Sequence, residues 1–307
     1  GQFTFQPSEF VKLIVVIGMA RFLSLLGDDI RDIRNFFISF LVIMPPMVLI
    51  SLQPDFGTAL VLIPIAFAML LIGGAKVGHM VSLIILSRLA LGVPMIVAYY
   101  KQIGKLDGWL IRIMADSKLL LTISVTLGSI ALVALLVNFF VRTKVFLKFA
   151  MALAIIPIGL SSAAVLNNYL QPYQQKRIAI FFDPEIDPFN SGYNIIQSKI
   201  AIGSGGLTGR GFIKGTQNQL AFLPEKKTDF VYSSFGEEWG FLGCFFLLGV
   251  YFLFIYKGVM IVYHAKDIQG SLIAAGIVAM FLFHVFINIG MATGMMPVTG
   301  LPLPFIS

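Results

Sequence analysis

Asp229 is a candidate catalytic carboxylate, because it stands where a long polar stretch returns to apolar sequence. It follows Lys226, Lys227 and Thr228 and precedes Phe230. A carboxylate that is partly buried beside cations can take a proton from a hydroxyl group and so serve as a general base. Most loop carboxylates are simply solvated. Its type and position therefore leave Asp229 as either a base or an ordinary surface carboxylate.

Glu9 and Lys12 form a second candidate group near the start of the chain. Their spacing of three places both on one face of a helix, where a carboxylate and an ammonium group can pair. One interpretation is an ion pair at the membrane surface, with Lys12 extending toward water. The other is a functional pair, since ionisable groups inside a membrane are costly and usually have a role.

Asp55 and two polar residues near the end of the chain are further candidates. Asp55 lies in the Pro-led turn of residues 53–58, where it is typical of a helix N-cap; a ligand contact is the alternative. His284 and Asn288 are four apart on one helical face, where such residues usually hydrogen-bond between helices. A proton relay is the alternative. The three histidines are far apart in sequence, which argues against a zinc site.

The polar stretch 169–238 holds a glycine-rich run, residues 203–215, that can form tight backbone turns. Backbone N–H groups of such a run, with Arg210 and Lys214 inside it, can hold a phosphate group. The spacing matches neither the P-loop nor the dinucleotide fingerprint, so a structured linker is the alternative. The whole stretch is far longer than an ordinary connection, and its many apolar residues argue against disorder.

Composition places these candidates in a membrane protein. Charged residues make up 12% of the chain and hydrophobic residues 58%, with a mean hydropathy of +0.90, whereas a soluble domain is about 25% charged. Disordered, collagen-like, coiled-coil and disulfide-stapled folds are excluded, and the single cysteine, Cys244, allows no intramolecular disulfide. The net charge of +7 lies largely at the edges of apolar segments, which is typical of contact with lipid headgroups and does not indicate nucleic-acid binding.

Eight apolar windows are long enough to predict membrane-spanning helices. They cover residues 10–26, 35–52, 57–74, 80–100, 119–141, 147–168, 239–262 and 271–290. Between the sixth and the seventh lies 169–238, which carries seven acidic and seven basic residues. We therefore expect an all-α polytopic integral membrane protein with a transmembrane bundle over 1–168, a large structured loop over 169–238 and a further transmembrane part over 239–307.

Basic residues indicate the orientation of these helices, because Lys and Arg in short loops stay on the cytoplasmic side. Loops 21–34, 75–79, 142–148 and 257–267 hold most of the basic residues outside the long polar stretch. The loop 169–238 is then extracellular. The chain starts at Gly1 without a methionine and stops after a Pro-rich stretch, so both ends look cut.

Eight motifs, in order along the chain, resemble the SEDS family, and RodA-like members more than FtsW-like ones. They are residues 5–12, 53–58, 183–188, 192–206, 214–217, 222–225 with 228–230, 237–240, and 288–291 with 302–307. The resemblance covers the chain except about 75–147, where a helix pair and its loop look inserted. Family members usually have ten spans, so it also implies that the first three and the last are missing and the 239–307 part is truncated.

The resemblance implies a membrane-embedded peptidoglycan glycosyltransferase that polymerises lipid II at the outer face of the bacterial inner membrane. It implies a role in cell-wall elongation and rod shape, with cell division served by FtsW-like members. The expected partners are a class B penicillin-binding protein and other elongation-complex proteins. The family's essential loop carboxylate falls on Asp229, and its Glu and Lys of the first motif fall on Glu9 and Lys12, which favours the functional interpretation of all three.

The expected reaction starts when Asp229 takes the proton of the acceptor GlcNAc 4-hydroxyl, which attacks the donor MurNAc anomeric carbon with inversion and releases undecaprenyl diphosphate. The residues expected to bind substrate are Glu9, Lys12, Asp55, Lys176, Arg177, Gln197, Lys199 and Thr228. We expect no organic cofactor. Mg²⁺ and Mn²⁺ prefer carboxylate and phosphate oxygens, so Asp229 or Asp55 together with the diphosphate is the expected place for such an ion. The alternatives are a lipid II flippase that makes no bond and a scaffold that only recruits the penicillin-binding protein.

Overall fold

The computed structural model describes residues 7–52, 56–104, 108–141, 144–189, 192–212, 214–215 and 229–307. In these ranges the regular structure is helical, without strands, as the sequence predicts. Asp55 and Thr228 lie outside the described residues. The chain forms two compact units, one of Gly1–Val77 with Tyr193–Ser307 and the other of Gly78–Gly192. These units group residues by contact, so the predicted division at 168 and 238, which follows membrane topology, stays a prediction.

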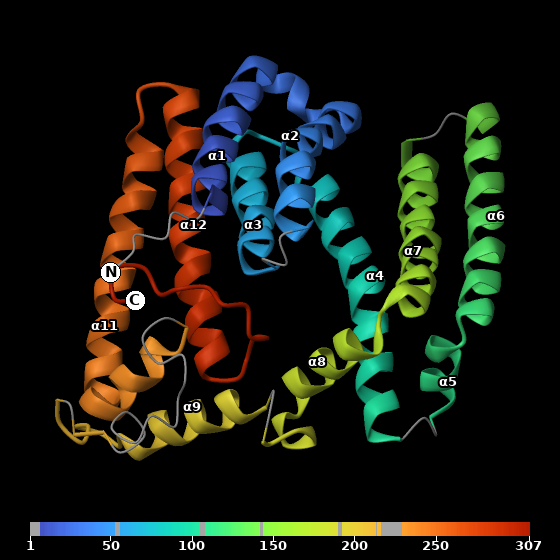
Figure 1. Cartoon of the computed structure of the whole chain (residues 1–307). Helices are drawn as coiled ribbons and strands as arrows, with labels where there is room; N and C mark the ends of the chain where they lie inside the picture. Colours follow the sequence, from blue (N-terminus) through green and yellow to red (C-terminus); the bar gives the residue numbers. More distant parts are fainter. Residues whose placement is uncertain are drawn as a thin grey trace. The chain divides into compact units, whose positions relative to one another are not determined.

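The first unit is organised around α12 (Figure 1). Its elements are α1 (Pro7–Leu26), η1 (Gly27–Arg31), α2 (Ile33–Leu52), α3 (Phe56–Ile72), α9 (Tyr193–Ser204), α11 (Val231–His264) and α12 (Ile268–Ala292). Helix α12 contacts α1, α3, α9 and α11. At Gly276 an added methyl group would lie 2.8 Å from Val16 and 3.0 Å from Met69. A small residue at this position therefore lets α1 and α3 approach α12 closely.

The second unit contains α4 (Val77–Ile103), α5 (Trp109–Ala115), α6 (Ser117–Val141), α7 (Lys144–Tyr169), α8 (Pro172–Phe182) and η2 (Pro184–Ile186). Helices α6 and α7 lie side by side (Figure 1). The buried hydroxyl of Ser124 donates to the carbonyl oxygen of Pro157 at 2.5 Å and so links the two helices. The side chain of Asn167 donates to the carbonyl oxygen of Met114 at 2.9 Å, which fixes the end of α7 beside α5.

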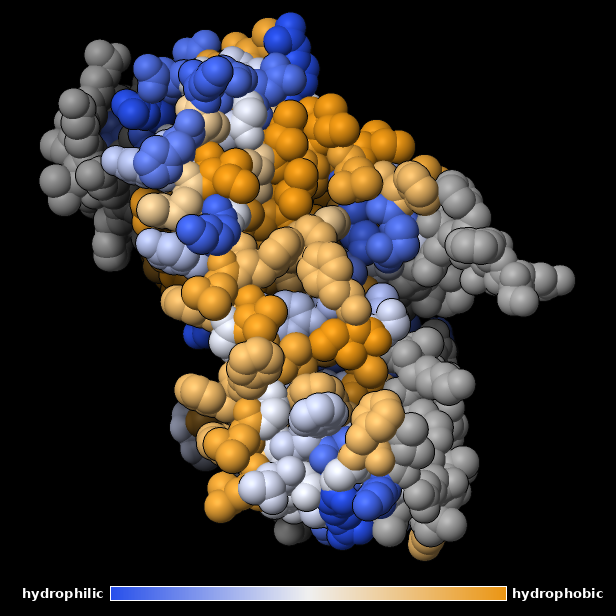
Figure 2. All heavy atoms as spheres, turned by 90° about the vertical axis from the view of Figure 1, so that its left-hand side faces the viewer, coloured by the Kyte–Doolittle hydropathy of each residue, from blue (hydrophilic) through white to orange (hydrophobic). Residues whose placement is uncertain are grey.

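Each of the eight predicted apolar windows coincides with a helix of the structure. Among the described residues, α1, α2, α4, α6, α11 and α12 are long and apolar enough to cross a membrane, and residues 153–182, which include α8 and are bent by 112°, can count as a seventh span. Helix α3 has 17 residues and is shorter. On the face shown in Figure 2, apolar side chains cover a broad surface between more hydrophilic regions. The all-α multi-pass architecture is confirmed, while the number of eight spans stays a prediction.

Helix α11 is broken at Gly240, which has a left-handed φ of 64°. The turn 205–211 is joined to this break through its backbone, and three of its glycines have positive φ, as the glycine-rich run predicts. Its bonds are Arg210 N–H to Glu237 O (3.0 Å), Gly211 N–H to Glu238 O (3.1 Å), Phe241 N–H to Gly206 O (2.9 Å) and Leu242 N–H to Leu207 O (3.0 Å). The turn thus replaces the helical bonds that a break leaves unmade.

The break also explains a difference from the prediction. The apolar window begins at residue 239, but α11 begins at Val231. Residues 231–239 form a helical segment before the break, and the long apolar segment follows it. Hydropathy therefore located the second segment and missed the first, which is polar enough to read as loop.

Candidate active site

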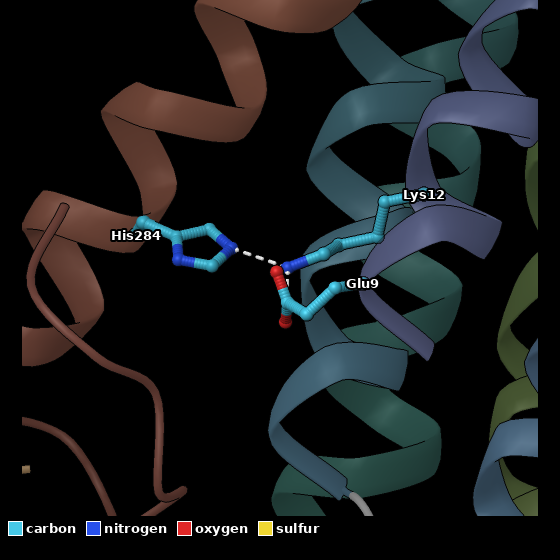
Figure 3. Close-up of polar contacts among 3 residues, drawn as sticks. All are labelled: Glu9, Lys12 and His284. Carbon is cyan, nitrogen blue, oxygen red and sulfur yellow. Dashed lines mark hydrogen bonds and ion pairs between the residues drawn. The ribbon is translucent and has the colours of Figure 1, made fainter. Parts of the chain in front are cut away.

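Glu9, Lys12 and His284 form a polar group between α1 and α12 (Figure 3). The Nζ atom of Lys12 lies 2.8 Å from Oε1 of Glu9 and 2.9 Å from Nε2 of His284. The side chain of Lys12 is 1% exposed, whereas that of Glu9 is 42% exposed. The predicted pairing of Glu9 with Lys12 is confirmed. The interpretation that Lys12 extends to water is wrong, because its ammonium group has two partners inside the protein.

Lys12 and Glu9 differ in how far their side chains are exposed. A buried charge is tolerated only when it is paired and hydrogen-bonded, and Lys12 meets both conditions. Glu9 presents its carboxylate toward the accessible side of the group. In this arrangement Lys12 holds Glu9 in place, and of the two side chains that of Glu9 is the more exposed; its role in binding substrate stays a prediction.

Asp229 lies two residues before the start of α11 and is held through its backbone by α12. The side-chain amide of Asn288 donates to the carbonyl oxygens of Asp229 at 2.9 Å and Leu301 at 2.7 Å. The half-buried carboxylate of Asp229 lies against the turn at Gly300, where an added methyl group would be 3.6 Å from Oδ2. Gly300 has a φ of 73°. One buried amide thus fixes both the candidate base and the segment 299–303 beside it.

The start of α3 packs on the same segment. A methyl group added at Gly57 would lie 2.3 Å from the carbonyl oxygen of Thr299 and 3.0 Å from the side chain of Leu301. Only glycine allows this approach, and the next residue, Thr58, is buried as well. The described end of the 53–58 motif therefore meets the Pro-rich motif near the end of the chain, close to Asp229.

Helix α9 is attached to the site by Ser198. Its hydroxyl bonds to the hydroxyl of Ser233 at 2.5 Å and to the carbonyl oxygen of Ala292 at 2.6 Å, which joins α9 to α11 and α12. The neighbouring Lys199 is exposed, and its terminal atoms lie over Gly294, where an added methyl group would be 2.8 Å from Nζ. Gln197 is half-buried. Lys199 and Gln197 thus belong to the same unit as Asp229, Glu9 and Lys12.

Lys176 and Arg177 are exposed residues of α8 and are described with the second unit. The Nζ atom of Lys176 lies 2.7 Å from Oδ2 of Asp187, which belongs to the acidic turn 183–188. The acidic turn therefore already supplies Lys176 with a counter-charge. Binding of a diphosphate by these two cations stays a prediction.

The described residues contain no group of three or more His, Cys, Asp and Glu side chains that could hold a metal ion. Asp55 lies outside these residues, and the assignment of the expected cation to Asp229 or Asp55 stays a prediction. His284 is a site residue that the expected substrate-binding set omits, although the sequence marks it as a candidate for hydrogen bonding between helices. Its signal is present in the sequence as an ionisable residue within an apolar helix, one turn before Asn288.

These features define a polytopic membrane protein with charged groups fixed between its helices. The family model FTSW_RODA_SPOVE, described as cell cycle protein, matches residues 1–116 and 108–307. The chain belongs to this FtsW/RodA/SpoVE family, which confirms the resemblance to SEDS proteins. The match includes 75–147, which the motifs did not cover.

Individual relatives place it within the family. The chain is 36% identical over 308 residues to the peptidoglycan glycosyltransferase RodA of Treponema pallidum, with 100% of this chain and 71% of that protein aligned. It is 33% identical to the peptidoglycan glycosyltransferase MrdB of Escherichia coli K12, covering 100% of this chain and 64% of that protein. Stage V sporulation protein E of Bacillus subtilis is 30% identical and is covered to 64%. This chain thus spans about two thirds of the length of these relatives.

A solved structure supports the same fold. This chain matches one chain of a solved structure with a TM-score of 0.61 and 25% sequence identity. That structure is described as the structural coordination of polymerization and crosslinking by a peptidoglycan synthase complex. The alignment covers 100% of this chain and 65% of that one.

Proposed function

We propose that this chain carries the catalytic region of a peptidoglycan glycosyltransferase that polymerises lipid II during cell-wall elongation. The observation that carries the proposal is the placement of Asp229, a half-buried residue whose backbone carbonyl is bound by Asn288 and whose carboxylate lies beside Gly300. The RodA and MrdB relatives, both named peptidoglycan glycosyltransferases, support it. Their names favour bond formation over transport, so a flippase is the weaker candidate.

In the proposed reaction, Asp229 accepts the proton of the GlcNAc 4-hydroxyl of the acceptor as the oxygen attacks the anomeric carbon of the donor MurNAc. The bond from that carbon to the diphosphate oxygen breaks, and undecaprenyl diphosphate leaves with the electron pair. Glu9 is suited to accept hydrogen bonds from sugar hydroxyls, because it is the exposed member of its group. Lys199 is suited to the departing diphosphate, since it is exposed and cationic. Lys12 acts through Glu9.

A divalent cation fits this site only with help from the substrate. Mg²⁺ is commonly bound by one or two carboxylates together with substrate phosphates, and the half-exposed carboxylate of Asp229 offers one such ligand. Asp55 is the second residue proposed to hold the ion. When bound, the ion would neutralise charge on the diphosphate.

The proposal includes a place in the cell and a partner. The distribution of basic loops supports an outer position for residues 169–238, and the proposed active site faces the outer leaflet of a bacterial inner membrane. A class B penicillin-binding protein is the proposed partner, and a chain similar to this one occurs in a synthase complex that combines polymerization with crosslinking. Other elongation-complex proteins are expected to join the pair.

The test is a polymerisation assay with the purified full-length protein. Fluorescent lipid II is incubated with Mn²⁺ or Mg²⁺, with and without a class B penicillin-binding protein, and the products are separated on a gel. A glycan ladder supports the proposal. Folded protein that leaves lipid II chemically unchanged under every condition contradicts it. Appearance of that lipid II on the far side of a vesicle membrane would then establish transport, and its absence would leave a scaffold.

A further inference from the structure

His284 connects two parts of the candidate site that lie far apart in the sequence. Its imidazole is 5% exposed. On one side its Nε2 atom lies 2.9 Å from Nζ of Lys12, 272 residues away. On the other side it hydrogen-bonds to the backbone of Pro302. The ring thus lies between α1 and the segment 299–303.

The chemistry of these two partners determines where the imidazole carries its proton. An ammonium group donates hydrogen bonds and cannot accept one, so Nε2 of His284 must accept from Lys12. Proline has no backbone N–H, so Pro302 offers only its carbonyl oxygen and the ring must donate to it. Both conditions are met by a neutral imidazole with its proton on Nδ1. An imidazolium would place a second cation against the ammonium of Lys12.

Asn288, one helical turn after His284, repeats the same kind of contact. It donates to the carbonyl oxygens of Leu301 and Asp229. His284 and Asn288 therefore bind two consecutive carbonyls, those of Pro302 and Leu301, in the segment against which the Asp229 carboxylate lies. Through these two side chains, α12 fixes the position of the segment 299–303 and with it the distance between the Glu9–Lys12 pair and Asp229.

We propose that His284 is a positioning residue, which as a neutral, Nδ1-protonated imidazole couples the Glu9–Lys12 pair to the segment that supports Asp229. The charged groups that face it are Lys12 and Glu9 of α1. Because His284 acts by joining Lys12 to the Pro302 carbonyl and is not assigned to the reacting atoms, most of the effect of its loss should depend on Lys12 being present. The proposal rests on the proposed polymerase function, and the tests below separate the two.

Glutamine can replace both hydrogen bonds of His284, because its amide oxygen accepts and its amide nitrogen donates. We expect polymerisation by His284→Gln to stay within about threefold of wild type, and His284→Leu to lower the rate about tenfold or more, as expected for loss of a bond to a charged group. In a Lys12→Met background, His284→Leu should cost less than about twofold, since coupled residues are non-additive. The control is His264→Gln, at an exposed histidine whose ring bonds within α11, which should change nothing.

The second readout does not need activity. The protein has three histidines, so ¹⁵N-histidine labelling gives few ring signals, and His284→Gln identifies those of His284. A neutral ring protonated on Nδ1 is expected at neutral pH; an imidazolium or an Nε2-protonated ring overturns the proposal. The proposal is also overturned if the His284→Leu variant polymerises at the wild-type rate. It is equally overturned if His284→Leu lowers the rate by the same factor in the wild-type and Lys12→Met backgrounds. A wild type without any ladder refutes the polymerase function, while the ring state still decides the role of His284.

Discussion

Replacing Gly57 with alanine should slow polymerisation while leaving the membrane fold in place. The added methyl group would lie 2.3 Å from the carbonyl oxygen of Thr299, and real contacts of this kind are essentially never below 3.0 Å. The segment 299–303 must therefore move away from α3 by at least 0.7 Å, the difference between these two distances. The carboxylate of Asp229 contacts this segment at Gly300, and Asn288 donates to the carbonyl oxygens of both Asp229 and Leu301. The carboxylate should therefore move as well.

The expected loss follows from the size of this displacement. A misplacement of about 1 Å at a reacting group can cost about a hundredfold in rate, so we expect Gly57→Ala to lower the rate of glycan formation by about 10- to 100-fold. The assay is the lipid II ladder at initial rate, beside thermal unfolding in detergent. The matched control is Gly249→Ala in α11, where no atom lies within 4 Å of the added methyl group and alanine favours the helix. Equal rates for the two variants would refute the reasoning.

Three further predictions test other contacts. Gly240→Ala should lower the unfolding temperature, because its φ of 64° is strained for alanine and the methyl group would lie 2.3 Å from the backbone nitrogen of Gly209; an unchanged temperature would show that the turn 205–211 does not hold the break. Ser198→Ala should destabilise the protein by about 1–3 kcal/mol by removing bonds to Ser233 and Ala292, whereas Ser204→Ala, which loses only a bond within its helix, should cost less in the same denaturation experiment. Lys176→Met should destabilise the protein by about 1–3 kcal/mol, because it removes the counter-charge that Lys176 gives to the buried Oδ2 atom of Asp187; if Lys176 binds diphosphate, the apparent KM for lipid II should rise, and an unchanged KM would remove it from the site.

The helices could be predicted from the sequence because each membrane-spanning segment is recognised from its own run of apolar residues. A lipid environment requires long apolar runs, and each of the eight runs coincides with a helix. The pairing of Glu9 with Lys12 was also predictable, since a spacing of three fixes their relative position on one helix. Both inferences use information from neighbouring residues only.

The partners of these residues could not be predicted in the same way. The contact of Lys12 with His284 joins positions 272 residues apart, and no periodicity encodes it. The early start of α11 was missed because residues 231–239 are too polar for an apolar window, and the backbone bonds that join their helix to the turn 205–211 cannot be seen in the sequence. Both features depend on which segments meet in three dimensions, so they emerge only from the packing of α1 on α12 and of the turn 205–211 on α11.

The most direct test of the central claim is Asp229→Asn in the lipid II assay. Asparagine keeps the size and the backbone carbonyl that Asn288 binds, but its amide cannot take a proton from a hydroxyl group. The account predicts that the variant expresses and unfolds like wild type and forms no glycan ladder, whether or not the penicillin-binding protein is present. A ladder formed at a rate near that of wild type would show that Asp229 is not the base.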